Sequence, residues 1–330
     1  MNSFGRLFRL NIFGESHQEE VGILLDGVPS GIKLDKEDFY TDLSRRKAGS
    51  LGTTKRVEAD EPQIKSGLYN GYTTGSPVLI SFKNNNTMSH DYDLFRNTPR
   101  PGHADFVLDK KYNGFNDIRG GGASSGRLTV GLVSAGVVAK KIIPDITFET
   151  KIVNLNGETD ESKFEDIIKN AEKDGDSVGG IVSLKAKNVK IGLGEPYFDS
   201  FESVLSHLLF SVGGVKGVEF GIGFKGVSLK GSQFNDSFIG KCGRTKTNNN
   251  GGINGGVTNG NDIEVNVFVK PTPSIYKEQQ TYNFKENTME NLLVKGRHDS
   301  AIIIRAQVVL EACLAIALAD FTLIDKAYRG

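Results

Sequence analysis

Residues 263–270 read IEVNVFVK, and this stretch decides the class of fold. Its apolar positions are Ile263, Val265, Val267 and Val269, and the side chains between them are Glu264, Asn266, Phe268 and Lys270. Alternation with a period of two is typical of a β-strand that buries one face and exposes the other. The stretch therefore predicts a half-buried strand.

Shorter strand-like runs lie near residues 23–25, 78–82, 181–184 and 218–224. Together with residues 263–270, these five runs outnumber the four main helical stretches, at residues 127–143, 164–171, 201–212 and 301–324, and do not alternate with them regularly. Regular alternation would be typical of a doubly wound parallel sheet, whereas grouped strands favour a sandwich-like arrangement. We therefore expect an α+β fold. A chain of 330 residues can form one compact domain or two intimate halves.

Helical patterns occur in five segments. The clearest places Phe201, Val204, Leu205, Leu208, Leu209 and Val212 on one stripe. The others are residues 35–46, 127–143, 164–171 followed by Gly175 as a C-terminal cap, and 301–324. Small residues such as Gly136 in the 127–143 segment predict close packing against another element. Arg305, Glu311 and Asp320 interrupt the apolar 301–324 segment, which favours a buried helix over a membrane span.

Bulk composition excludes several function classes. Forty basic residues balance forty acidic ones, so no global charge points to nucleic acid or to a membrane surface. The N-terminus lacks the apolar stretch of a signal peptide. Cys242 and Cys313 have no metal-ligand or C-x-x-C spacing, and the five histidines include no pair at i, i+3 or i, i+4. We expect a cytoplasmic protein without a metal site.

Two glycine-rich matches to nucleotide-binding motifs fail on context. Residues 221–226 fit G-x-G-x-x-G, but strand-like residues continue on both sides as far as Leu229, which argues against a dinucleotide site. Residues 121–126 have the glycine spacing of a P-loop, but Arg127 and Leu128 replace its lysine and hydroxyl residue. The glycine- and asparagine-rich residues 248–260 could form a linker, but they lead straight into the strand at Ile263, so we interpret them as a ligand-contacting loop.

Cationic and protonatable side chains gather in glycine-flanked turns. They are His17, Arg45, Arg46, Arg100, His103, Arg119, Arg127, Arg297, His298 and Asp299. Arginine matches carboxylate and phosphate geometry, and histidine titrates near neutrality, so the set suits proton transfer on a polyanionic substrate. Taken alone, Arg45 and Arg46 could complement a helix dipole at the surface, and the turn before Arg127 could hold no ligand. His90 and His207 are interpreted as solvated bystanders.

Three motifs closely resemble those of the chorismate synthase family. They are GESH at residues 14–17, RPGHAD at 100–105 and GRHD at 296–299. Further matches run nearly from end to end, at residues 26–29, 45–46, 119–122, 215–219, 251–260 and 270–272. Chance could supply one of these matches, but hardly all of them in the same order and spacing.

The resemblance implies one domain over residues 1–330, a β-α-β sandwich with antiparallel sheets and flanking helices, and a homotetramer. The implied reaction converts 5-enolpyruvylshikimate 3-phosphate to chorismate by a 1,4-elimination of phosphate and a proton. It implies reduced FMN as cofactor without net redox change. The sequence leaves open whether the chain reduces its own flavin with NADPH.

The resemblance also implies individual roles. His17 resembles the histidine that protonates the leaving phosphate, His103 the one that protonates reduced flavin, and Asp299 the aspartate that works with flavin N5 in proton removal. Implied substrate contacts are Ser16, Arg46, Arg100, Arg127 and Arg297. Implied FMN contacts are Ala123, Ser124, Ser125, Gly213, Gly214, Gly255, Lys270, Pro271, Thr272, Pro273, Ser274 and Arg297.

Two alternatives remain open. Gln18 replaces the family's usual glycine, Ala123 a usual arginine or other polar residue, and Leu128 a usual glutamate. A relative that binds FMN but has lost activity would fit these changes. A flavin oxidoreductase would instead consume NAD(P)H stoichiometrically.

Overall fold

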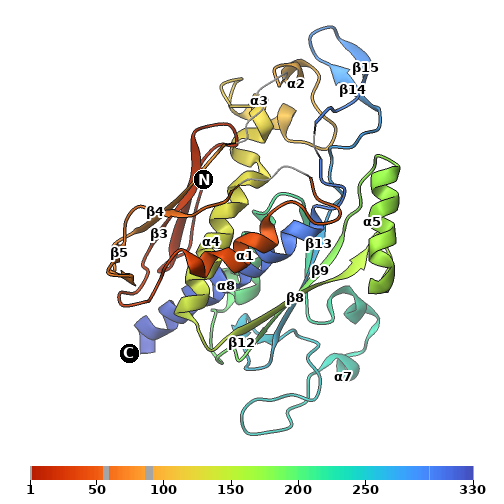
Figure 1. The fold of residues 1–330 in the computed structure, drawn as a ribbon. Helices are drawn as coiled ribbons and strands as arrows, with labels where there is room; N and C mark the ends of the chain where they lie inside the picture. Colours follow the sequence, from red (N-terminus) through yellow and green to blue (C-terminus); the bar gives the residue numbers. More distant parts are fainter. Residues whose placement is uncertain (1, 55–58, 86–91, 297, 330) are drawn as a thin grey trace.

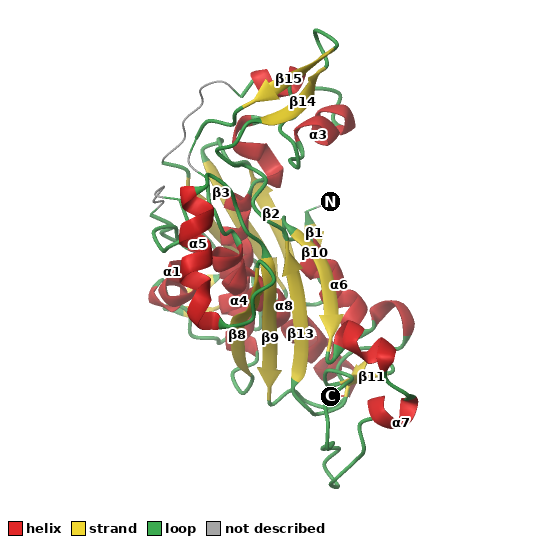
Figure 2. Cartoon of the chain, turned by 90° about the vertical axis from the view of Figure 1, so that its right-hand side faces the viewer, coloured by secondary structure: helices red, strands yellow, loops and turns green. Residues whose placement is uncertain are grey.

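Two antiparallel sheets enclose a layer of helices in the computed structural model of the chain, which describes residues 2–54, 59–85, 92–296 and 298–329 (Figure 2). One sheet has the order β1-β2-β3-β7-β4, with bounds Ser3–Phe4, Arg9–Gly14, Glu20–Asp26, Val78–Lys83 and Gln63–Ile64. The other has the order β10-β13-β9-β8, with bounds Val215–Phe220, Ile263–Val269, Gly180–Lys187 and Thr147–Leu155. Neighbouring strands in both sheets are antiparallel, which confirms the predicted α+β class.

The predicted strand at residues 263–269 is β13, the second strand of its sheet. Its four apolar positions are all buried, and Val265 and Val267 pair with Leu184 and Val182 of β9, which are buried as well. The alternation in sequence therefore corresponds to one face against the core.

Helices α4 (Thr129–Ile142) and α8 (Ile303–Arg329) form the middle layer (Figure 1). Helix α4 contacts β2, β3 and β7 of one sheet, α8 contacts β8 and β9 of the other, and the two helices pack against each other. This arrangement is the β-α-β sandwich that the resemblance implied. The two longest helices lie between the sheets rather than at their flanks.

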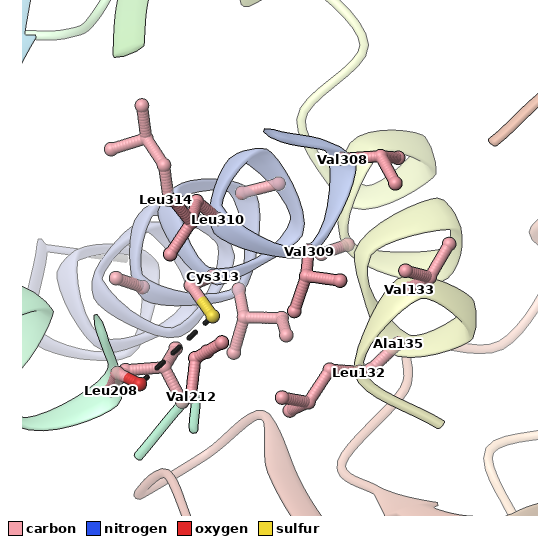
Figure 3. Packing of buried hydrophobic residues seen from close by; sticks show 14 of the residues in the cluster. Leu132, Val133, Ala135, Leu208, Val212, Val308, Val309, Leu310, Cys313 and Leu314 are labelled. Carbon is pink, nitrogen blue, oxygen red and sulfur yellow. Dashed lines mark hydrogen bonds between the residues drawn. The ribbon is translucent and has the colours of Figure 1, made fainter. Parts of the chain in front are cut away.

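Small residues allow α4 and α8 to approach closely, as predicted. A β-carbon at Gly136 would lie 2.4 Å from the β-carbon of Ala312, so only glycine fits that crossing. In Figure 3, Cys313 of α8 points toward Leu208 and Val212, and its Sγ lies 4.0 Å from the Leu208 carbonyl oxygen. Burial raises the pKa of the Cys313 thiol to about 12, so this cysteine behaves as an inert core residue.

Helix α8 is long and apolar enough to cross a membrane by length and composition, but 78% of its most apolar stretch is buried inside the fold. The buried helix that we predicted is therefore confirmed. Its charged residues are paired: Glu311 accepts hydrogen bonds from Arg45 and Lys140. Asp320 accepts hydrogen bonds at 2.8–2.9 Å from the backbone N–H groups of residues 6, 7 and 8, and so ties the N-terminal segment to α8.

The remaining predicted helices are present: two are shorter than predicted, and the one that begins at Phe164 extends beyond Ala171 to Lys173. They are α1 (Tyr40–Arg46) preceded by the 3₁₀ helix η1 (Glu37–Phe39), α5 (Phe164–Lys173) and α6 (Phe201–Phe210). Gly175 follows α5 with φ of +65°, as expected of a helix C-terminal cap. The smaller elements are β5 (Leu68–Tyr69), β6 (Tyr72–Thr73), α2 (Leu94–Asn97), α3 (Asp105–Lys111), η2 (Arg119–Ser124), η3 (Gly126–Leu128), η4 (Glu161–Lys163), η5 (Tyr197–Asp199), α7 (Gly231–Phe234), β11 (Ile253–Asn254), β12 (Val257–Thr258), β14 (Gln279–Asn283) and β15 (Thr288–Leu292).

One strand prediction was wrong in its extent. Strand β10 ends at Phe220, and residues 223–228 form the 3₁₀ helix η6 instead of continuing as a strand toward Leu229. Gly221 has φ of +56°, and a β-carbon there would lie 2.1 Å from the Asn249 carbonyl oxygen. The backbone therefore turns at Gly221, which the strand-like side chains around it do not reveal.

Candidate active site

A cavity of about 790 Å³ lies where β1, the η2 turn, residues 211–214 and the start of α8 meet. Its basic lining residues are Arg46, Lys47, Arg100, Arg127, Lys270 and Arg305, and its acidic ones are Asp60, Asp105, Asp117 and Asp299. Six basic groups against four acidic ones favour an anionic ligand, although the whole chain is neutral. The volume is within the range of small-molecule and cofactor sites.

His17 lies directly behind the cavity wall that Ser16 and Gly120 form. Its ring packs edge-on against Tyr92 at a centroid distance of 5.3 Å. A β-carbon at Gly120 would lie 2.4 Å from His17 Cε1 and 2.8 Å from Ser16 Oγ. The glycine-rich turn and the first histidine motif, a hundred residues apart, are therefore fitted to each other.

His103 lies in a turn that is fixed on both sides. Its Nε2 lies 2.7 Å from Ser274 Oγ, and the Gly102 carbonyl accepts a hydrogen bond from Lys270 Nζ at 2.8 Å. Arg100 donates two parallel hydrogen bonds, at 2.7 and 2.8 Å, to the carboxylate of Asp105. Burial, reinforced by the charge of Arg100, lowers the pKa of His103 to about 4, so the ring is neutral at pH 7.

Two buried arginines share one carboxylate. Arg46 and Arg127 both bind Asp60, Arg46 at 2.8 Å, and Arg46 also donates to Thr129 Oγ1 at 3.0 Å. Burial lowers the pKa of Arg46 to about 9, against the opposing charge of Asp60. Asp60 has φ of +47°, an uncommon conformation for a residue with a side chain. Arg46 is therefore a buried site residue and not a surface complement to the helix dipole.

Asp299 precedes α8 and lines the cavity. Its Oδ1 accepts a hydrogen bond from the Thr54 backbone N–H at 2.6 Å, and its Oδ2 lies 3.1 Å from the Arg305 guanidinium. His103 and Asp299 thus line the same cavity, with His17 just behind its wall.

The implied cofactor contacts divide into two groups. Those that line the cavity are Ala123, Ser124, Ser125, Gly213, Gly214, Lys270 and Pro273. Ser274 contacts His103, and Pro271 and Thr272 lie in the same segment. Gly255 lies in the exposed turn between β11 and β12 and is not among the residues that line the cavity. Arg297 lies outside the described residues, as does His90.

Sequence reasoning missed several residues of the site. Asp60 and Arg305 line the cavity and hold other site residues. His207 also lines it, but His207 is exposed and packs edge-on against Phe4 at 5.6 Å, in keeping with its interpretation as a solvated bystander. An available signal for Arg305 was its position in an otherwise apolar helix, where a charge needs a partner. Asp60 carried no comparable signal.

These contacts are typical of a class of enzyme that acts on anionic small molecules, in which arginines at a cavity lie beside histidine and aspartate side chains suited to proton transfer. The chorismate synthase family model matches residues 8–323. Chorismate synthase of Chitinophaga pinensis is 54% identical over 327 residues, covering 99% of this chain and 98% of the relative, and that of Thermococcus gammatolerans is 43% identical, covering 99% of each. A solved structure described as the crystal structure of chorismate synthase aligns with a TM-score of 0.74 at 26% identity, covering 97% of this chain and 93% of that one.

The chain belongs to the chorismate synthase family. It is a lyase that forms chorismate with loss of phosphate, and the alternative readings of an inactive relative or a flavin oxidoreductase are not favoured.

Proposed function

We propose that the cavity performs an anti-1,4-elimination of phosphate from 5-enolpyruvylshikimate 3-phosphate with the help of reduced FMN. The observation that carries the proposal is the convergence of His103, Asp299 and the buried arginines on one cavity, with His17 behind its wall. These groups come from positions far apart in the sequence.

The residues present fit a flavin phosphate and its ring. Ser124 and Ser125 offer hydroxyl groups beside a glycine turn, and Lys270 offers a positive charge. Burial and the charge of Lys216 lower the pKa of Lys270. A bound anionic group would offset this crowding of positive charge. Leu132, Leu208, Val212, Ile302 and Val309 supply an apolar wall. Reduced FMN, when bound, supplies the electron density that helps an allylic phosphate to leave.

Arginine side chains would bind the substrate anions. Arg46 and Arg127 share the single negative charge of Asp60, so this pair keeps one net positive charge for a phosphate or carboxylate. Ser16 and Arg100 complete the proposed contacts within the described residues, and Arg297 is proposed by resemblance alone.

Three side chains would handle protons. His17 would protonate the departing phosphate, and Asp299, whose carboxylate is oriented from both sides, would take part in removing the substrate proton. His103, whose pKa of about 4 leaves its ring neutral at pH 7, would hold a proton beside the flavin once bound anions favour its charged form.

An anaerobic assay with dithionite-reduced FMN tests the proposal. Chorismate absorbance and inorganic phosphate should rise together, without reductant consumed per turnover. Release of neither product would overturn the proposal, and stoichiometric NADPH consumption without phosphate release would establish the oxidoreductase alternative. Repeating the assay with oxidised FMN and NADPH tests whether the chain reduces its own flavin.

Ligand binding supplies a separate measurement for the alternative of an inactive relative. Gln18 donates to Asp117 at 3.2 Å, Ala123 lines the cavity, and Leu128 is buried, so these three departures from the family pattern leave the cavity intact. Reduced FMN and substrate together should raise the melting temperature by linkage. Stabilisation by FMN without any phosphate release would indicate an inactive relative.

A homotetramer and a cytoplasmic location belong to the same proposal. Several large apolar side chains are exposed near η5, η6 and the following loop, among them Phe198 at 92%, Phe224 at 77% and Phe238 at 74% exposure. Such patches are typical of interfaces between subunits. Cys242 and Cys313 are both free, in keeping with a reducing compartment. Multi-angle light scattering should give about four times the mass of 35.9 kDa.

A further inference from the structure

We propose that Arg305 is a positioning residue that holds the Asp299 carboxylate in the cavity and fixes it relative to Arg46. This inference deepens the proposed function and rests on the proposed role of Asp299. Arg305 lies in the first turn of α8 and lines the cavity.

The Arg305 guanidinium joins two walls of the site. Its NH1 group lies 3.1 Å from Asp299 Oδ2, and its Nε donates to the Arg46 carbonyl oxygen at 2.8 Å. Arg46 is the last residue of α1, and α1 packs against α8 (Figure 1). One side chain therefore sets the separation between the carboxylate and the helix end that carries the substrate-binding arginine.

The second oxygen of Asp299 is held independently. Oδ1 accepts from the Thr54 N–H at 2.6 Å, and the loop before Thr54 is docked by the Gly52 N–H on Glu172 at 3.0 Å and by the Ala301 N–H on the Gly52 carbonyl at 2.9 Å. Arg305 thus completes a two-sided clamp on the carboxylate. Its Nε and NH1 groups both contact protein, and the NH1 contact is with Asp299 itself, so the geometry of Arg305 fits a positioning role.

Variants of Arg305 test this by separating kcat from KM. Arg305→Met removes both hydrogen bonds while keeping an unbranched side chain, so kcat should fall roughly 10- to 100-fold with KM for the phosphorylated substrate within about threefold. Arg305→Lys keeps the charge but not the planar fork, and should recover part of the loss. Arg329→Met, at the exposed far end of the same helix, is the matched control and should keep wild-type kcat.

Three outcomes of these assays overturn the inference. They are an unchanged kcat in Arg305→Met, a loss confined to KM, and no recovery in Arg305→Lys when both variants have wild-type melting temperatures.

A double-mutant cycle with Asp299 identifies the route of the effect. If Arg305 acts through Asp299, adding Arg305→Met to Asp299→Ala should reduce kcat by less than about twofold beyond the single variant. Multiplicative losses would show that Arg305 acts elsewhere and would overturn the inference.

A readout without turnover keeps this inference distinct from the proposed reaction. In a crystal structure of Arg305→Met, the Asp299 carboxylate should rotate so that Oδ2 leaves its wild-type position, whereas in Arg329→Met it should stay. An unmoved carboxylate overturns the positioning role. A wild-type chain that releases no phosphate overturns the proposed function, and the crystal structures then decide the positioning by themselves.

Discussion

The ring of His17 occupies the space that a side chain at Gly120 would fill. The nearest ring atoms, Cε1 and Nδ1, lie 2.4 and 2.6 Å from where a β-carbon at position 120 would be. Gly120 has φ of +58°, a backbone conformation that favours glycine. Glycine is therefore required here both for its backbone conformation and for its lack of a side chain. The glycine-rich turn therefore determines where this histidine can lie.

Gly120→Ala should lower turnover at least tenfold, because its methyl group must displace the His17 ring. Gly121→Ala is the matched control: Gly121 also has a positive φ, of +84°, but its β-carbon would meet nothing closer than 3.7 Å. Both variants carry backbone strain, and only the first collides with His17. Steady-state assays should show the larger loss for Gly120→Ala, and equal losses would contradict the steric account.

His17→Ala and His103→Ala should each reduce turnover by a factor of about 10² or more, the usual scale for acid–base groups. His207→Ala, an exposed histidine at the same cavity, should stay within about threefold of wild type. Rates close to wild type for the first two variants would remove their assigned roles.

Acidification should destabilise the chain partly through His103. Its folded pKa of about 4 lies below the ordinary value of 6.5, so between these values the unfolded chain binds more protons and stability falls as the pH is lowered. The contribution is at most about 3 kcal/mol and is complete below pH 4. Urea unfolding of His103→Gln should show a shallower loss of stability from pH 6.5 to pH 4 than wild type. Parallel curves would contradict this.

Glu311→Gln should lower the free energy of unfolding at pH 7 by about 3 kcal/mol, because Arg45 and Lys140 would lose a buried partner. Burial alone would raise the pKa of Glu311, but these two cations outweigh it and hold the pKa at about 2. The stabilisation is therefore present above pH 4.5 and lost as the pH falls through 2. Glu149→Gln, at an exposed pair with Lys187, should leave stability unchanged, and a similar effect at both sites would argue against burial as the cause.

Gly136→Ala should destabilise the fold by about 1–3 kcal/mol, although alanine is ordinarily the better helix former. The added methyl group would overlap Ala312 of α8. Gly231→Ala, in a short helix where a β-carbon meets nothing within 4 Å, is the control and should be neutral or slightly stabilising. Thermal unfolding of the two variants separates packing from helix propensity.

Periodic patterns predicted the core elements because burial imposes the pattern directly. The alternation of Ile263 to Val269 corresponds to β13, and the small residues around Gly136 correspond to the α4–α8 contact. Turns that depend on one backbone angle were harder to predict from sequence. Strand β10 ends before Gly221, and only the φ angle of Gly221 distinguishes a turn there from a continuing strand. The nine-residue strand β8 was missed, since its sequence TFETKIVNL carries few strongly alternating positions.

For the site, chemistry-bearing residues could be predicted and their neighbours could not. Resemblance pointed to His103, Asp299 and Arg46, which now lie around one cavity. Asp60, which pairs with two arginines, gives no signal in sequence because its partners lie 14 and 67 residues away. Gly255, assigned to the cofactor by resemblance, lies in an exposed turn of this chain and stays a prediction.

The Asp320 carboxylate, which binds the backbone N–H groups of residues 6–8, determines how early during translation the cavity can form. Residues 2–4, which line the cavity, are translated early, but the group that anchors their neighbours is translated more than 300 residues later. Domains fold as units during translation, and here the wall formed by residues 2–4 must wait for helix α8. A nascent chain truncated before α8 would therefore lack a formed catalytic cavity, which delays ligand capture until α8 has been synthesised.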